Sequence, residues 1–222
     1  MRKNTWLSWS SGKDSAWALH VLRQSDEHEV TGLFTTINSA FDRVAMHAVR
    51  VELLRKQAQA VGLPLYLIEI PYPCSNEQYA ATMSDFMANA RGEGVQFMAF
   101  GDLYLEDVRR YREERMQDTG IAPVFPLWGK PTRALLEEML ANGLRACLTC
   151  VDPSVLPAEF AGCELTAKLL ERMPEHIDPC GENGEFHTFV FDGPMFAQPL
   201  DIEMGEVVTR DGFVFADFWL RE

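Results

Sequence analysis

The stretch SWSSGKDSAWAL, residues 8–19, decides how the chain begins, because it joins a strand pattern to a helix pattern through a polar turn. Residues 5–9, TWLSW, are apolar enough for a buried strand, and apolar side chains recur at helical spacing between residues 15 and 22. The first strand-to-helix turn of an α/β protein commonly binds phosphate, because the helix presents unpaired N–H groups there. The stretch therefore predicts an anion-binding turn.

The chemistry of this turn favours a nucleotide together with a divalent cation. Gly12 lets an anion approach the backbone closely, and Lys13 adds a positive charge. Asp14 would repel a phosphate unless a cation lay between them, so an acid at this position indicates Mg²⁺. The residues expected to bind the nucleotide at this turn are Ser10, Ser11, Gly12, Lys13, Asp14 and Ser15.

Three better-known motifs do not match the turn. A Walker A loop requires glycine where Leu7 stands, and Ser or Thr where Asp14 follows the lysine. The stretch contains neither the nucleophile elbow Gly-x-Ser-x-Gly nor the dinucleotide motif Gly-x-Gly-x-x-Gly. A turn that only caps a helix needs a single Ser or Asp, which leaves the density of polar residues unexplained.

The composition is that of a folded protein with an acidic surface. The 222 residues are 47% hydrophobic and 24% charged, and 20 basic against 33 acidic side chains give a net charge of −13. This charge disfavours nucleic acids and anionic membranes as partners. We expect a cytoplasmic protein with five reduced cysteines, since the sequence has no signal-peptide pattern and no apolar run that could span a bilayer.

Apolar runs alternate with helix patterns over the first 150 residues, as in a parallel sheet covered by helices. We therefore predict an α/β fold with a doubly wound parallel sheet. The expected strands of this sheet span residues 5–9, 29–37, 65–70, 95–102 and 144–151. The expected helices cover residues 15–22, 44–58, 79–90 and 132–140, the last of them capped by Thr132 and ended by Asn142-Gly143.

The pattern changes after about residue 174 to that of a small β-rich part. EFHTFVF, residues 185–191, alternates in hydrophobicity, and two further strand patterns flank Asp211-Gly212, a dipeptide typical of hairpins. We predict two domains: a nucleotide-binding α/β domain at residues 1–152, and a β-rich subdomain with a substrate loop at residues 153–222.

Several motifs together resemble those of the PP-loop family of N-type ATP pyrophosphatases, which are adenine nucleotide alpha hydrolase-like proteins. SSGKDS, residues 10–15, resembles the family loop Ser-Gly-Gly-x-Asp-Ser, with Ser11 in place of the first glycine. The resemblance extends to the diphthine–ammonia ligase branch of this family and covers most of the chain. The matching motifs are MHAVR (46–50), FGDLYLEDVRRYREER (100–115), PLWG (126–129) and GENGEFHTFVFDGPMF (181–196).

The resemblance implies an ATP-dependent ligase that forms a carbon–nitrogen bond. Such an enzyme attaches AMP to a carboxylate, releases pyrophosphate, and lets ammonia or an amine expel the AMP to leave an amide. It implies ATP and Mg²⁺, with Asp14 as a metal ligand, and a small-molecule or protein-borne carboxylate as the partner of the ammonia or amine donor. The branch motif Gly-Glu-Gly-Gly-Glu-Tyr-Glu-Thr is altered here at Asn183 and His187, so the sequence leaves the identity of the carboxylate open.

The late loop supplies further candidates for catalysis. Glu182 and Glu185 could hold ammonium, Mg²⁺ or a cationic substrate, and His187 could act as a general base near neutral pH. The expected catalytic residues are Lys13, Asp14, Glu182, Glu185 and His187. We expect the last three to lie near the α-phosphate end of the ATP site. The alternative is a solvated acidic turn that leads into a strand.

Two strand ends supply further candidates for binding. Thr35 and Thr36 end the second strand and are expected to flank the adenine, while Gly101 and Asp102 end the fourth, where open α/β sheets bind ligands. Asp102 could instead cap the next helix. For other reactive side chains we expect structural roles: His47, the exposed charges Arg109, Arg110 and Glu113, and the buried thiols Cys147, Cys150 and Cys180.

Two other functions use the same loop and remain open. A tRNA-modifying relative would adenylate a base carbonyl, but the net charge of −13 and the absence of a basic tract count against RNA. A nucleotide-binding sensor would hold ATP or AMP without chemistry, and the concentration of Glu and His in the late loop counts against it.

Overall fold

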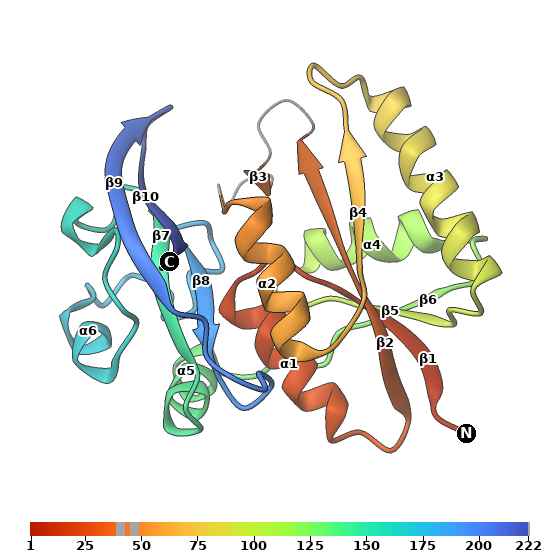
Figure 1. Cartoon of the computed structure of the whole chain (residues 1–222), viewed down its shortest axis with the longest axis horizontal. Coiled ribbons are helices and arrows are strands. Elements are labelled where there is room, and N and C mark those ends of the chain that lie inside the picture. The colour runs from red at the N-terminus through yellow and green to blue at the C-terminus, as the bar shows by residue number, and fades with distance from the viewer. Residues whose placement is uncertain (39–42, 45–48, 222) are drawn as a thin grey trace.

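The protein consists of two sheets, and helices α1 and α2 lie between them (Figure 1). The structure is a computed structural model that describes residues 1–38, 43–44 and 49–221. Its strands are β1 (Lys3–Ser8), β2 (His28–Asn38), β3 (Arg43–Val44), β4 (Leu65–Ile70), β5 (Phe97–Ala99), β6 (Ala122–Val124), β7 (Arg145–Val151), β8 (Phe186–Asp192), β9 (Ile202–Arg210) and β10 (Phe213–Leu220). Its helices are α1 (Lys13–Arg23), α2 (Val51–Val61), α3 (Asn76–Gly92), α4 (Glu106–Met116), α5 (Thr132–Ala141), the 3₁₀ turn Ala158–Phe160 and α6 (Ala167–Arg172).

The first sheet is the doubly wound parallel sheet that the sequence predicts. Its parallel strands lie in the order β4-β2-β1-β5-β6, and β3 pairs antiparallel with the end of β2. The chain order reverses at β1, which has β2 on one side and β5 on the other. Ligands of such sheets bind beyond the carboxyl ends of the strands at this reversal, and the turn at residues 10–15 follows β1 there.

The two faces of the parallel sheet pack against different elements. On the face covered by α1 and α2, Leu7 and Leu54 share one core with Phe189 of the second sheet. On the opposite face, covered by α3 and α4, Trp6 and Met98 belong to a separate and smaller apolar cluster. The second sheet is therefore fixed to one face of the first by α1 and α2, as Figure 1 shows.

The second sheet has the order β8-β7-β10-β9, and all of its neighbours are antiparallel. The prediction that residues 144–151 form a fifth parallel strand is wrong, because β7 pairs with β8 and β10 in this sheet. Six of its seven residues are buried, so its apolar run has the same pattern as a strand of a covered parallel sheet. Along the chain, β6 is the last strand of the first sheet and β7 is the first strand of the second sheet. The predicted domain boundary at residue 152 stays a prediction.

The predicted start of the second helix at residue 44 is wrong, because Val44 belongs to β3 and α2 begins only at Val51. Most other predicted element ends agree with the structure. Asp211 and Gly212 both have positive φ and join β9 to β10 as predicted, and α5 ends at Asn142-Gly143. The predicted cap at Thr132 is wrong, since Pro131 precedes the helix and Thr132 is its first residue. His47 lies outside the described residues. In the described ranges, no helix is long and apolar enough to cross a membrane.

Gly101 lies where the chain leaving β5 meets the first turn of α1. A Cβ atom at this position would lie 2.9 Å from the backbone carbonyl carbon of Asp14 and 3.0 Å from the backbone nitrogen of Ser15. Backbone atoms cannot yield without a shift of α1 against the sheet, so only glycine allows this approach. The contact holds the start of α1 against the carboxyl edge of the sheet.

We predict that Gly101→Ala lowers the melting temperature, because the added methyl group overlaps the backbone of α1. Overpacking of this kind costs about 1–3 kcal/mol, and each kcal/mol shifts the midpoint by roughly 2–4 °C in a chain of this size. Gly92→Ala is the matched control: a Cβ at this helical position meets nothing within 4 Å, so its melting temperature should hold or rise. Equal calorimetric midpoints for both variants would contradict the proposed contact.

Candidate functional site

The turn between β1 and α1 has a strained backbone and an unusual cap. Ser11 has φ of +69°, a conformation that favours glycine, and it stands where the PP-loop pattern has glycine. Gly12 precedes α1 in extended conformation and provides no side-chain cap. The backbone N–H of Lys13 instead donates to Thr188 Oγ1 on β8, at 3.1 Å. The second sheet thus completes the helix N-terminus that the sequence assigns to phosphate binding.

Lys13 is buried, with 2% of its surface exposed. Its ammonium group lies 2.9 Å from Asp14 Oδ2, donates to the backbone carbonyl of Cys180 and faces the ring of Phe186. Burial opposes the charged form, but the charge and hydrogen bond of Asp14, with smaller effects of Cys180 and Glu182, outweigh it and raise the pKa of Lys13. A permanent positive charge therefore lies beneath the turn.

Gln57 of α2 connects the turn to both sheets, and its side chain is fully buried. Its amide oxygen accepts from Trp9 Nε1 at 2.8 Å, and its amide nitrogen donates to the carbonyls of Ser11 at 3.0 Å and Val190 at 2.6 Å. The backbone N–H of Val190 also donates to Ser11 O at 3.0 Å. One side chain thus joins the end of β1, the strained residue of the turn and strand β8.

The late loop returns to the turn and places Glu182 beside it. Glu182 Oε1 accepts from the backbone N–H of Leu103 at 2.8 Å, and its own N–H donates to Asp178 Oδ2 at 2.9 Å. Burial raises the pKa of Glu182 to about 7, and the negative charges of Asp14 and Asp102 act in the same direction. A carboxyl group that exchanges its proton near neutral pH therefore lies within electrostatic reach of the turn.

The other two late-loop candidates differ from Glu182. Glu185 is buried, and its carboxylate accepts from the backbone N–H groups of Asp178 and Asn183 and from the Asn183 amide, at 3.0–3.1 Å. These hydrogen bonds close the loop around Glu185, and its catalytic role stays a prediction. Burial and the charge of Lys13 lower the pKa of His187 to about 4, so the ring is neutral and weakly basic at pH 7. Of Glu182 and His187, Glu182 has the pKa better suited to a proton acceptor.

Asp14 is the described residue best suited to bind a cation. Its Oδ2 accepts from Lys13, while its buried Oδ1 has no hydrogen-bond partner among the described residues. A buried carboxylate oxygen without a partner is unfavourable unless a ligand or ion completes it. No group of three His, Cys, Asp or Glu side chains in the described ranges could hold a metal alone, so a cation here would also need ligand oxygens.

The binding candidates at the strand ends separate into two environments. Thr35 is buried, and its hydroxyl donates to the carbonyl of Trp9 beneath the turn, whereas Thr36 lines a groove on the α3 and α4 face. Asp102 accepts two hydrogen bonds from Arg112, at 2.5 and 3.0 Å. The alternative that Asp102 caps a helix is wrong, because Leu105 occupies the cap of α4.

Two family models match the chain in succession: the diphthamide synthase N-terminal domain at residues 3–123, and the diphthamide synthase C-terminal domain at residues 131–216. The chain belongs to the diphthamide synthase family. Among its curated relatives, the diphthine–ammonia ligase of Danio rerio is 32% identical over 72% of this chain and 68% of its own length. The diphthine–ammonia ligase of Rattus norvegicus is 30% identical over 79% of this chain and 70% of its own length.

The two family models correspond to the two sheets described above. The N-terminal match contains β1 to β5 and the turn, and the C-terminal match contains β7, β8 and the late loop. The turn and the late loop that closes over it therefore come from different parts of the diphthamide synthase pattern. This explains why the candidate site depends on both sheets.

Other reactive side chains have structural roles in this family member. Burial raises the pKa of Cys147 and Cys180 to about 12 and that of Cys150 to about 11, as expected for packed thiols. Arg109 pairs with Glu113 at 2.7 Å, and its guanidinium lies over the rings of Phe125 and Trp128.

Sequence reasoning missed three residues of the site: Gln57, Thr188 and Arg112. The first had a usable signal, because Gln57 interrupts the apolar face of α2 and a polar residue there needs a buried partner. Thr188 and Arg112 lie in the family-like motifs at residues 181–196 and 100–115, but the sequence does not indicate their partners. The partner of Thr188 is distant in sequence, and Arg112 belongs to an ordinary charged helix.

We predict that Gln57→Leu strongly destabilises the protein. The substitution leaves the Trp9 N–H and two buried carbonyls with one partner fewer, and each buried group left unsatisfied costs about 1–3 kcal/mol. Urea unfolding measures the loss as a lower midpoint. Gln59→Leu is the control because Gln59 is exposed on the same helix, and a midpoint shift as large as that of Gln57→Leu would refute the role assigned here.

A second prediction concerns the pH dependence of folding. The pKa of Glu182 is about 7 in the folded protein against an ordinary 4.5, so the folded state holds a proton that the unfolded chain releases between these values. The wild type should therefore lose stability relative to Glu182→Gln as pH rises from about 4.5 to 7, and the difference should level off above that. Melting temperatures of the ligand-free proteins at pH 5, 6, 7 and 8 measure this, and a pH-independent difference would contradict it.

Proposed function

We propose that this chain condenses a carboxylate with ammonia or an amine at the expense of ATP, with diphthine as the first substrate to test. Relatives that match most of the chain are named diphthine–ammonia ligase, and membership of the family makes the chain an ATP-dependent ligase that forms a carbon–nitrogen bond. The observation that carries the proposal is the closure of the late loop over the turn, which brings Glu182 to Lys13 and Asp14.

The turn is suited to bind the phosphates of ATP. The N-terminus of α1 points its positive dipole end at this position, and the buried ammonium of Lys13 adds a charge that solvent does not screen. Asp14 would hold Mg²⁺ through its unpartnered Oδ1, and the cation would neutralise phosphate charge. These groups are held by the protein before ligand binds, which is the arrangement that electrostatic catalysis requires.

Glu182 is suited to take the proton that amide formation releases. Ammonia is nucleophilic only without its fourth proton, and the nitrogen sheds a further proton after it attacks the activated carboxylate. A carboxylate whose pKa is about 7 accepts a proton at physiological pH and returns it to water readily. His187, with a pKa of about 4, is a weaker base, so we assign the proton transfer to Glu182.

We predict that turnover yields AMP and pyrophosphate, with nitrogen from ¹⁵N-ammonium incorporated into the carboxylate substrate. The assay supplies Mg-ATP, labelled ammonium and protein-borne diphthine, and detects products by ³¹P NMR and mass spectrometry. Asp14→Asn should reduce the rate about tenfold or more, because a charge-assisted contact contributes roughly 1.5–3 kcal/mol.

Asp26→Asn is the matched control, since the carboxylate of Asp26 is fully exposed, 3.5 Å from Arg2, and it should retain the wild-type rate. Release of ADP and phosphate instead of AMP would refute the proposed chemistry. Binding of Mg-ATP without any release of AMP would favour a nucleotide sensor.

A further inference from the structure

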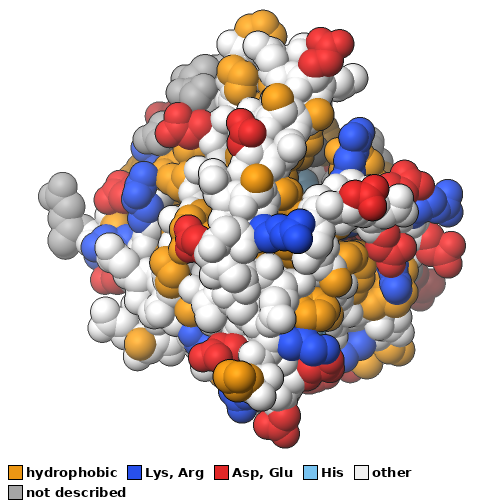
Figure 2. Space-filling view, turned by 90° about the vertical axis from the view of Figure 1, so that its right-hand side faces the viewer, with side chains coloured by type: hydrophobic (Ala, Val, Ile, Leu, Met, Phe, Trp, Pro, Cys, Tyr) orange, Lys and Arg blue, Asp and Glu red, His pale blue; other side chains and the backbone are white. Residues whose placement is uncertain are grey.

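A groove of about 660 Å³ runs between α3 and α4 on the face of the parallel sheet opposite to α1 and α2. Its floor is apolar and includes Phe34 and Met98 of the sheet and Met83 and Met87 of α3. Figure 2 shows hydrophobic side chains gathered in a hollow on this face, with basic side chains beside it. The volume and lining are those of a small-molecule site.

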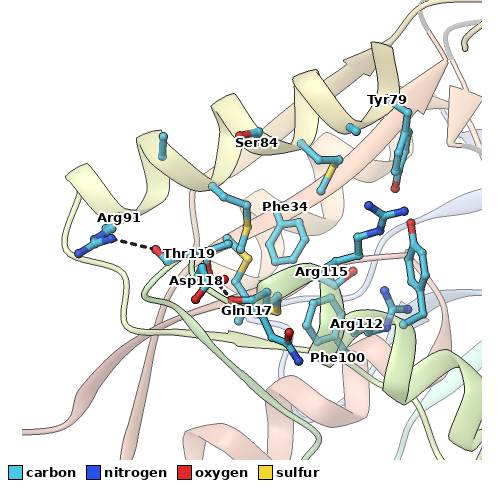
Figure 3. A pocket seen from close by; sticks show the side chains of 18 of the residues that line it. Phe34, Tyr79, Ser84, Arg91, Phe100, Arg112, Arg115, Gln117, Asp118 and Thr119 are labelled. Atoms are coloured by element: carbon cyan, nitrogen blue, oxygen red, sulfur yellow. Dashed lines mark hydrogen bonds between the residues drawn. The ribbon is translucent and has the colours of Figure 1, made fainter. Parts of the chain in front are cut away.

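One end of the groove is polar and positively charged. Tyr79 of α3 lies there opposite Arg112 and Arg115 of α4 (Figure 3). Tyr111 of α4 also lines the groove and interacts electrostatically with Tyr79. Burial raises the pKa of Tyr79 while the two guanidinium groups act in the opposite direction, so both charges reach its hydroxyl. Two phenols and two arginines therefore converge at one end of an apolar channel.

The charges at this end match a ligand with a single negative charge. Arg112 is compensated by its paired hydrogen bonds to Asp102. Arg115 forms no ion pair with any described residue, and its guanidinium lies over the ring of Tyr111 at 5.3 Å. One uncompensated guanidinium beside two hydroxyl donors suits a carboxylate.

The polar end lies at the same edge of the sheet as the nucleotide turn. Ser8 ends β1 and lines the groove, and the turn begins two residues later. Asp102 follows β5 and binds Arg112, while its neighbour Gly101 contacts the first turn of α1. A carboxylate at Arg115 would thus enter from the edge where the turn presents its N–H groups.

We propose that this groove binds a carboxylate with an apolar body, and that this ligand is the carboxylate substrate of the ligase. The second part rests on the proposed function. The apolar body lies along the methionines of α3, and the carboxylate meets Arg115 and the two tyrosines at the edge of the sheet.

The test uses 8-anilinonaphthalene-1-sulfonate, a fluorescent dye with a flat apolar body and one negative charge. The folded wild type should bind one dye, 4-phenylbutyrate should displace it, and 4-phenylbutylamine, which has the same body and the opposite charge, should not.

Ala80→Trp fills the groove and should weaken dye binding about tenfold or more, whereas Ala81→Trp, exposed on the same helix outside the groove, should not. Arg115→Gln should weaken it similarly, with Arg110→Gln, an exposed arginine of α4 outside the groove, as its control.

Three results would overturn the proposal. Dye binding that survives in Ala80→Trp would place the dye elsewhere. Displacement by a non-hydrolysable ATP analogue with Mg²⁺ would make the groove part of the nucleotide site, in line with the sequence-based expectation that Thr36, which lines the groove, flanks the adenine. Displacement by inorganic phosphate as effective as that by 4-phenylbutyrate would make it a phosphate site. Calorimetric binding of Mg-ATP is measured separately for each variant, so a failure of the nucleotide site is distinguished from a failure of the groove.

Discussion

The buried ammonium group of Lys13 constrains the architecture around it. An ammonium group removed from water is costly unless oxygen atoms surround it, and the turn itself supplies only Asp14. The remaining contacts come from the Cys180 carbonyl and the Phe186 ring, more than 160 positions further along the chain. The late loop must therefore close over the turn, the second sheet must pack against α1, and α1 and α2 must lie between the two sheets.

The two faces of the parallel sheet are packed differently. The face under α1 and α2 belongs to the larger core, which continues through Phe189 into the second sheet. The face under α3 and α4 has a smaller core, and these two helices leave room between them for the groove. Both faces meet at the carboxyl edge, where the turn, Asp102 and Glu182 lie together.

The sequence predicts local structure and its chemistry better than it predicts long-range pairing. The turn at residues 10–15 is recognisable because its polar residues are contiguous, and the hairpin at Asp211-Gly212 because its backbone requirement is local. The partner of a buried strand is not local: the apolar pattern of β7 fits either sheet, and only tertiary packing selects the second. The difference between Glu182 and Glu185 also depends on folding, since both are acids of one loop and only their neighbours set their roles.

The hydrogen bond between Lys13 N and Thr188 Oγ1 has a consequence for the order of events during synthesis. Residues 1–124 contain every strand of the parallel sheet and leave the ribosome first, yet the N-terminus of α1 obtains this acceptor only when β8 has emerged and docked. A nascent chain therefore has a turn at residues 10–15 whose geometry is incomplete. The turn becomes complete only in a molecule whose last third has folded, so the same contact that caps the helix also ties the geometry of the turn to the folding of the second sheet.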